Sequence, residues 1–256
     1  FIWETFSKEY VLKGSFDKYI SSDKNKKGTT TVDSEFLQSL DKWRVELALN
    51  IALRNKDLPD GKAGINEEEL NFVVQHTIDR LIFLRIAEDR SAEPYGELQN
   101  SIKSGSYYQN LLHNFHIADQ KYNSGLFDFK KDKISDRITI DNKVIKEIIS
   151  ELYYPICPYE FSVLSVEILG SAYEQFLGKQ ITLSKNGKAI IEEKPEVRKA
   201  GGVYYTPQYI VEYIVKNTIG KLIENKTPKE VSNIKICDPA CGSGSFLIGA
   251  YQFLLD

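Results

Sequence analysis

Apolar residues between positions 33 and 55 recur at helical spacing. They predict a helix that begins after Asp33 or Ser34, whose side chains can cap its first turn, and that runs to about Asn55. The residues on its apolar face are Phe36, Leu40, Trp43, Leu47 and Ile51. Because such a stripe ordinarily packs in a core, it predicts structure rather than a binding site.

A second helix is predicted from Asn66 to about Arg90. Asn66 and Glu69 have the spacing of a capping box, and Pro94 follows the helix. Its apolar stripe consists of Leu70, Val74, Ile78, Leu81 and Leu84. Four charged residues near its end are expected to be solvated or to form structural ion pairs: Arg85, Glu88, Asp89 and Arg90.

The middle of the chain predicts further helices and one hairpin. Short helices are expected at 106–112 and 116–122, one from an Asp141 cap through Tyr153, and one over 161–177 that ends at Gly178. Two β-prone runs flank Asn186–Gly187, a strong hairpin signal, so the region near 181–193 is expected to form a small two-stranded β-hairpin. Residues 21–32 read as a polar linker.

Residues 201–256 contain helix signals on both sides of a glycine loop. Thr206 is expected to cap a helix that begins at Pro207 and buries Val211, Val215, Ile219 and Leu222. Ile234–Cys237 predicts a short buried parallel strand, residues 238–244 a tight loop, and Ser245–Leu255 an apolar helix. Strand, glycine loop and helix is an arrangement that cradles nucleotide-like ligands.

Known phosphate motifs do not fit this loop. The dinucleotide pattern needs a glycine three residues after Gly244, where this chain has Leu247, and the triphosphate loop needs a lysine that is absent. S-adenosylmethionine has no phosphate; it carries an ammonium, a carboxylate, a sulfonium and a ribose. An acidic residue beside a glycine loop suits such a ligand.

Two motifs make the resemblance specific. DPACGSGSFL at 238–247 resembles the cofactor motif of adenine-N6 DNA methyltransferases, and GGVYYTP at 201–207 resembles the motif that precedes it in that family. The resemblance implies S-adenosylmethionine as cofactor, with Tyr205, Thr206 and Pro207 lining its methionine end. It implies that the same ligand lies over Asp238, Pro239, Ala240, Cys241, Gly242 and Gly244.

Upstream segments widen the resemblance to most of the chain. LDKWRVELALNIALRN, RLIFLRIAEDRSAEPYGEL, NSGLFD and EILGSAYEQFLG resemble the helical connector of large single-chain restriction–modification enzymes. The expected fold is therefore a mainly α-helical connector at 33–200, preceded by a tail at 1–32. It is followed at 201–256 by the first strand and flanking helices of an α/β Rossmann-like methyltransferase domain.

The resemblance implies double-stranded DNA as the partner of the parent protein, with a nuclease domain accompanying the methyltransferase. The chain begins at Phe1, so we expect a piece of a longer protein. It contains no Asn/Asp-Pro-Pro-aromatic motif, which in this family holds the adenine. We therefore assign no catalytic residue and expect the piece alone to be inactive.

Two alternatives stay open: a helical spacer or docking module of a phage-defence protein with a non-functional methyltransferase segment, and a methyltransferase that acts on RNA or protein. Net charge and composition do not distinguish between these alternatives. The 256 residues carry a net charge of −3, without the basic excess of a compact nucleic-acid-binding module. No run approaches the roughly 18 apolar residues of a membrane span, and three cysteines form no disulfide framework, so we expect a cytoplasmic protein. His113 and His116 are expected at the surface, and no metal site is predicted.

Overall fold

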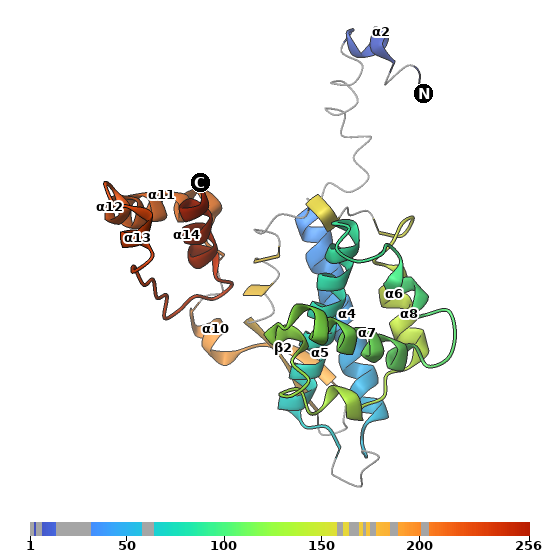
Figure 1. Ribbon diagram of the computed structural model, residues 1–256. Helices are drawn as coiled ribbons and strands as arrows, with labels where there is room; N and C mark the ends of the chain where they lie inside the picture. The colour runs from blue at the N-terminus through green and yellow to red at the C-terminus, as the bar shows by residue number, and fades with distance from the viewer. Residues whose placement is uncertain are drawn as a thin grey trace. The chain divides into compact units, whose positions relative to one another are not determined.

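The computed structural model is mainly helical (Figure 1). It describes residues 3, 7–13, 32–57, 64–157, 161–163, 169–170, 173–174, 178–184, 189–200 and 205–256. The chain divides into two compact units, Phe1–Ser39 and Leu40–Asp256. Helix α4 (Val32–Arg54) runs from the first unit into the second.

Within the described residues, the first unit contains the short helix α2 (Lys8–Val11) and the first turns of α4. Lys13 pairs with Glu9 at 2.6 Å on the surface of the α2 segment. In α4 the Ser39 hydroxyl donates to the carbonyl of Glu35 at 3.1 Å, and the Phe36 side chain is buried. The predicted linker at 21–32 lies outside the described residues except at its last position.

The other elements belong to the second unit. The described helices before its hairpin include α5 (Glu67–Asp89), α6 (Glu97–Asn100), α7 (Tyr107–Tyr122) and α8 (Asn142–Ser150), with short 3₁₀ turns η2 (Gly125–Phe127), η3 (Ser135–Arg137) and η4 (Phe161–Val163). The hairpin strands are β1 (Lys179–Leu183) and β2 (Ala189–Glu193). The elements after it are α10 (Pro195–Ala200), α11 (Gln208–Val215), the π-helical turn η5 (Lys216–Gly220), α12 (Lys221–Ile223), α13 (Pro228–Val231) and α14 (Ser245–Leu255).

The helix predicted from Asn66 is confirmed as α5, including its capping box. Asn66 Oδ1 accepts from the backbone N–H of Glu69 at 2.9 Å, and Glu69 Oε2 accepts from the N–H of Asn66 at 3.1 Å. These two bonds satisfy N–H groups that have no partner within the helix. The apolar residues predicted for its stripe are all buried. This helix packs against α6, β1, η2 and η4 and so forms the centre of the second unit.

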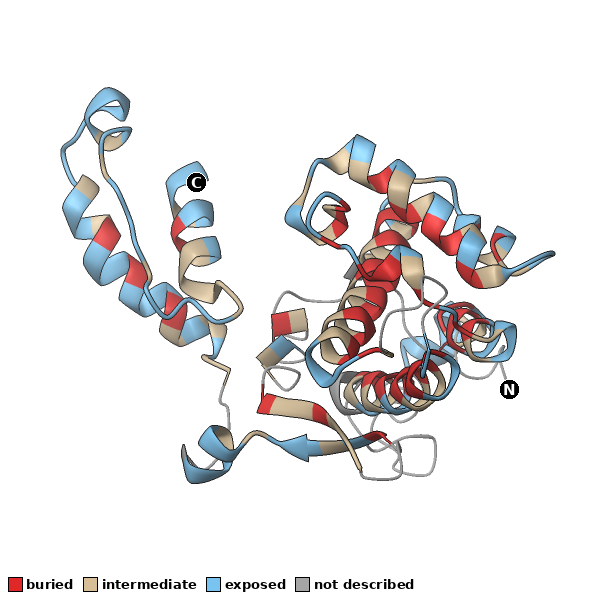
Figure 2. Cartoon of the chain, turned by 90° about the horizontal axis from the view of Figure 1, so that it is seen from below, coloured by how far each residue is buried: buried red, intermediate tan, exposed pale blue. Residues whose placement is uncertain are grey.

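Helix α4 covers the predicted range, and from Leu40 onward its apolar face is buried. It begins at Val32, however, so Asp33 and Ser34 lie inside the helix and not at the predicted cap before it. Polar contacts to distant segments fix its position. Trp43 Nε1 donates to Glu151 at 2.7 Å, and the Asn55 amide donates to the carbonyl of Thr139 at 2.9 Å. Figure 2 shows buried positions recurring along the helices, as the sequence periodicity predicts.

Two predictions in the middle of the chain need correction. The two short helices expected at 106–112 and 116–122 form one continuous helix, α7, because no breaking residue separates them. Asp141 precedes α8 but does not cap it with its side chain. Instead its carboxylate accepts from Asn50 at 2.8 Å and from Arg54 at 2.9 Å, and α8 ends at Ser150 rather than at Tyr153.

The predicted hairpin is confirmed as the antiparallel pair β1 and β2. Ile181 lies opposite Ile191, and the Ile181 side chain is buried. The Asn186–Gly187 turn and Gly201–Gly202 lie outside the described residues. Most of the predicted helix at 161–177 also lies outside them; its described beginning is the 3₁₀ turn η4 rather than an α-helix.

The helix after Pro207 buries Val211, Val215 and Ile219 as predicted, but Leu222 is 51% exposed. Partly buried Ile223 packs on this cluster instead. The reason is the π-helical turn η5, whose wider spacing moves the next inward position on by one residue. No helix of the described residues is long and apolar enough to cross a membrane.

The strand predicted at Ile234–Cys237 is not formed. The structure assigns no strand to these residues, and Ile236 is 41% exposed. A parallel strand exists only through hydrogen bonds to its neighbours. The two strands among the described residues, β1 and β2, pair with each other, so Ile234–Cys237 has no ladder to join.

A buried ion pair joins α5 to the loop before η3. Arg80 Nη2 lies 2.8 Å from Asp132 Oδ2, and both side chains are 1% exposed. Arg80 also donates to the carbonyl of Leu126 at 2.9 Å and lies over the ring of Phe129, while Asp132 accepts from the N–H of Ser135 at 2.9 Å. Burial disfavours the carboxylate, but the hydrogen bonds from Ser135 and Arg80 hold the pKa of Asp132 below its usual range.

Asp132→Asn is expected to lower the free energy of unfolding by about 3 kcal/mol, because it leaves the buried Arg80 charge without its partner. Asp128→Asn serves as the control, since its pair with Lys131 lies at the surface, and should leave stability nearly unchanged. Urea unfolding monitored by circular dichroism measures both. Equal effects of the two substitutions would contradict a structural role for the buried pair.

The contribution of Asp79 to stability can be tested through its dependence on pH. Burial raises its pKa to about 6, although a hydrogen bond from Gln75 and the charges of Arg80 and Arg44 act against the rise. The folded state therefore keeps this proton where the unfolded chain has lost it, and the stability that Asp79 contributes falls as pH rises from about 4 to about 6. Asp79→Asn removes that loss, so its advantage over wild type should grow by roughly 2 kcal/mol between pH 4 and pH 7. Parallel stability–pH curves from urea unfolding would disprove this.

Candidate cofactor site

The loop at residues 238–244 turns sharply before α14. Gly242 has a φ of +52° and Gly244 a φ of +81°, backbone conformations that favour glycine. The N–H of Gly244 donates to the carbonyl of Cys241 at 2.7 Å, and the N–H of Ala240 donates to Asp238 Oδ1 at 3.0 Å. The loop is therefore held by its own backbone and by the Asp238 carboxylate.

Helix α14 begins at this loop without a side-chain cap. Gly244 occupies the cap position, and the Ser243 and Ser245 hydroxyls lie 2.9 Å apart, bonded to each other. No acidic residue lies in the first turn of the helix. The first turn therefore presents backbone N–H groups and the positive end of the helix dipole toward the loop.

Glu174 contacts this loop from a segment 64 or more residues earlier. Its Oε1 accepts from the N–H of Ser243 at 3.1 Å, and a Cβ atom on Gly242 would lie 2.6 Å from the same oxygen. A larger residue at position 242 would displace the carboxylate. The sequence reasoning did not single out Glu174; the quoted segment EILGSAYEQFLG contains it, but an isolated glutamate in a helical pattern carries no signal of its own.

Tyr205 is the first described residue of the predicted upstream motif. Its ring lies so close to Gly170 that a Cβ atom there would collide with Cε2 of the tyrosine. The Tyr205 hydroxyl is buried and has no hydrogen-bond partner among the described residues. A buried polar group without a partner is unusual and calls for an explanation.

Two residues only four positions apart contact the two motifs. Gly170 and Glu174 are each in helical conformation, and residues 171–172 between them lie outside the described residues. Gly170 contacts Tyr205, and Glu174 contacts the loop at Gly242 and Ser243. Two of the sequence motifs, far apart in the chain, thus meet the same short segment.

The other predicted site residues differ in exposure. Asp238, Gly244 and Thr206 are half-buried, and Pro207 is exposed. The exposed loop residues are Pro239, Ala240, Cys241 and Gly242. Thr206 does not cap the helix as predicted: α11 begins at Gln208, and Pro207, with an extended ψ of 144°, takes the cap position and leaves Thr206 outside the helix.

Other candidate residues have structural or surface roles. His116 is half-buried and lies 2.9 Å from Asp136, while His113 is exposed as predicted. Among the described residues no group of three or more His, Cys, Asp or Glu side chains is placed to hold a metal ion. Cys157 is buried, while Cys237 and Cys241 are exposed; all three are free.

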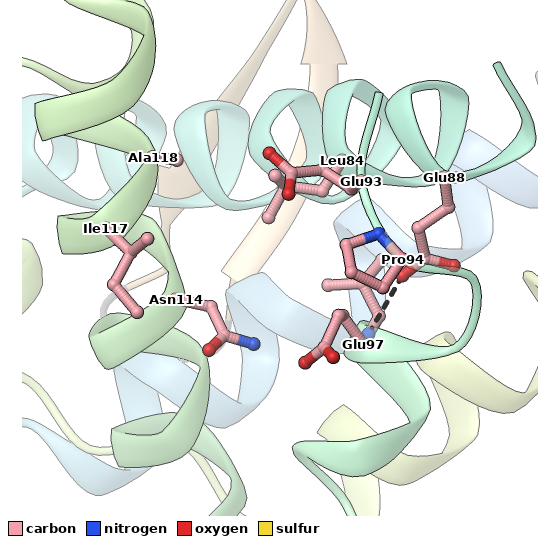
Figure 3. Close-up of a pocket in the computed structure, with 9 residues that line it drawn as sticks. Leu84, Glu88, Glu93, Pro94, Glu97, Asn114, Ile117 and Ala118 are labelled. Atoms are coloured by element: carbon pink, nitrogen blue, oxygen red, sulfur yellow. Dashed lines mark hydrogen bonds between the residues drawn. The ribbon is translucent and has the colours of Figure 1, made fainter. Parts of the chain in front are cut away.

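The charged residues near the end of α5 are mostly buried rather than solvated. Arg85 pairs with Asp89 and donates to the carbonyl of Leu152 at 2.9 Å, and Glu88 accepts from the Tyr153 hydroxyl at 2.6 Å. Beside them lies a pocket of about 240 Å³, lined by residues of α5, α6 and α7 and the loop at Pro94 (Figure 3). None of the predicted cofactor residues lines it, so it is separate from the candidate site.

Comparison with protein families assigns the sequence of this region to a class of enzyme. Residues 164–256 match the family model described as N-6 DNA Methylase. The matched range contains Glu174, Tyr205 and the whole 238–244 loop. This part of the chain is therefore an N-6 DNA methylase segment, as the two sequence motifs indicated.

Two relatives of this chain are proteins whose names combine a restriction enzyme and a methyltransferase. Over 249 residues, 97% of this chain, the sequence is 37% identical to the type II restriction enzyme and methyltransferase RM.Eco57I of Escherichia coli. It is 27% identical over 256 residues to RM.MjaORFECS2P of Methanocaldococcus jannaschii, a protein named for the same two activities, with 70% of this chain matched. The chain is homologous to one part of such proteins and spans 24% and 20% of their lengths. No solved structure gives a significant match.

Packing between α11 and α14 gives a test of how the site is supported. A Cβ atom on Gly249 would lie 2.7 Å from Cγ1 of Val211, inside the cluster that joins the two helices. Gly249→Ala should therefore weaken this packing by about 1–2 kcal/mol, although alanine favours helix formation. Hydrogen exchange of the α11 and α14 amides should speed up.

Gly125→Ala is the matched control, because a Cβ atom there would meet nothing within 4 Å. It should leave exchange throughout the chain unchanged. Slower exchange in α14 of the Gly249→Ala variant would show that helix propensity, and not close packing, decides at this position.

Proposed function

We propose that this chain supplies the S-adenosylmethionine-binding part of a DNA adenine-N6 methyltransferase within a combined restriction–modification protein. The observation that carries the proposal is that two residues only four positions apart contact the two motifs. Gly170 contacts Tyr205, and Glu174 contacts the 238–244 loop. The match of residues 164–256 to the N-6 DNA methylases supports the same assignment.

The residues present fit this cofactor. The buried Tyr205 hydroxyl has no hydrogen-bond partner among the described residues and so has unused donor and acceptor capacity. Gly242 lets the Glu174 carboxylate approach the loop more closely than a Cβ atom would allow. Segments 161–178, 201–215 and 236–256 contain no lysine or arginine, which disfavours a phosphate ligand and favours one that carries positive charge.

In this proposal each motif has a defined part. Asp238 accepts hydrogen bonds from the methionine end of the ligand, and Tyr205, Thr206 and Pro207 line that end. The backbone that approaches the ligand closely is that of Pro239, Ala240, Cys241, Gly242 and Gly244. When bound, S-adenosylmethionine supplies a methyl group on a sulfonium centre; the protein's share in this chain is to bind and orient it.

The same proposal gives a role to the apolar surface at the end of the chain. Ile248, Tyr251 and Leu255 of α14 are exposed, and Figure 2 shows the helix at the C-terminus as mostly exposed or intermediate. In a Rossmann-like domain the apolar face of such a helix packs on a parallel sheet. Residues 33–200 are the helical connector, and the substrate is adenine in double-stranded DNA.

Asp238→Ala in the full-length protein should weaken S-adenosylmethionine binding at least about tenfold, because a hydrogen bond to a charged group is lost. Isothermal titration calorimetry measures the affinity. Asp136→Ala is the control and should bind as wild type does. It removes an exposed carboxylate that pairs with His116 and lies about 100 residues before the 238–244 loop in the sequence. A folded wild-type protein that does not bind would refute the proposed function and favour a helical spacer.

The 256-residue chain by itself should not transfer methyl groups to DNA. It has no Asn/Asp-Pro-Pro-aromatic sequence to hold the adenine amino group. Incubation with tritiated S-adenosylmethionine and double-stranded DNA should leave the DNA unlabelled, whereas the full-length protein should label it at adenine. Label incorporated by the 256-residue chain would overturn this division of roles.

A further inference from the structure

We propose that Glu174 is a further cofactor-binding residue, whose carboxylate recognises the ammonium group of S-adenosylmethionine. This inference rests on the proposed function and adds a residue from outside both sequence motifs. It starts from the position of the carboxylate, which is half-buried and lies against the glycine loop rather than in solvent.

The contact with the loop orients one oxygen and leaves the other available. Glu174 Oε1 accepts from the Ser243 N–H at 3.1 Å, while Oε2 forms no hydrogen bond within the described residues. A carboxylate has more acceptor positions than this single contact uses. The Ser243 N–H therefore holds the side chain at the loop with acceptor capacity to spare.

The charge around this carboxylate favours a cationic ligand. Glu174 and Asp238 both contact the 238–244 loop, and neither forms an ion pair within the described residues. The sequence around the contacting residues, at 161–178, 201–215 and 236–256, contains no lysine or arginine. A cationic ligand at this loop would be attracted by each of the two carboxylates.

Within S-adenosylmethionine, the ammonium fits better than the sulfonium. The ammonium has three N–H donors, which can reach more than one carboxylate oxygen, whereas the sulfonium has no hydrogen to donate. The N–H that already binds Glu174 belongs to the loop itself, so the carboxylate is oriented before the ligand arrives. We infer that Glu174 and Asp238 share the ammonium.

The competing role is purely structural: Glu174 would hold the loop in shape through the Ser243 N–H and never contact the ligand. Glu174→Gln separates the two roles. A glutamine oxygen can still accept from the Ser243 N–H, but it carries no charge for the ammonium. Glu174→Ala removes both contacts. Glu212→Gln, which changes an exposed carboxylate on α11, is the matched control.

The experiment is calorimetric titration of the full-length protein and these variants with three ligands: S-adenosylmethionine, S-adenosylhomocysteine, which keeps the ammonium but is not a sulfonium, and methylthioadenosine, which lacks both. Glu174→Gln should weaken the first two by about tenfold and leave methylthioadenosine within about twofold of wild type. Glu212→Gln should change none of them. Circular dichroism confirms that each variant is folded.

Four results would overturn the proposal. Unchanged binding of all ligands by Glu174→Gln, with binding lost in Glu174→Ala, assigns Glu174 the structural role alone. Weaker binding of S-adenosylmethionine but not of S-adenosylhomocysteine places the carboxylate at the sulfonium. If the wild-type protein does not bind S-adenosylmethionine, the proposed function is wrong as well. If Asp238→Ala loses binding while Glu174→Gln keeps the wild-type affinity, only the role of Glu174 is wrong.

Discussion

The candidate site depends on close approach at glycine. A Cβ atom on Gly170 would collide with the Tyr205 ring, and one on Gly242 would lie 2.6 Å from Glu174 Oε1. On the supporting helix, a Cβ atom on Gly249 would lie 2.7 Å from Val211. Each contact joins segments distant in the chain, and each exists because one partner has no side chain. The positions of the two motifs relative to each other therefore rest on packing that most other residues would prevent.

The buried carboxylate of the helical part and the carboxylates of the candidate site have different partners. The Arg80–Asp132 pair is fully buried, and hydrogen bonds satisfy both members, as expected of a structural ion pair. At the site, Glu174 and Asp238 contact backbone N–H groups and have no cationic partner within the described residues. A carboxylate that has a counter-charge stabilises the fold, whereas one that lacks it is suited to bind a cation.

Local patterns predicted the helical part well and the site only in outline. The capping box at Asn66 and the hairpin were readable because neighbouring residues specify them. The strand at Ile234–Cys237 was not, because a strand requires partners that sequence periodicity does not guarantee. The loop at 238–244 was recognised from its glycines and its acidic residue. Glu174 was missed because its meaning comes from contact with a loop 64 and more residues away.

The central claim is that one ligand is held jointly by the Tyr205 segment, the Glu174 segment and the 238–244 loop. Hydrogen exchange of the full-length protein with and without S-adenosylmethionine tests it directly. We predict that the ligand slows exchange in all three segments together, with the same dependence on concentration, and leaves α5 and α7 unaffected. Protection confined to one segment, or protection of α5 and α7 instead, would contradict the claim.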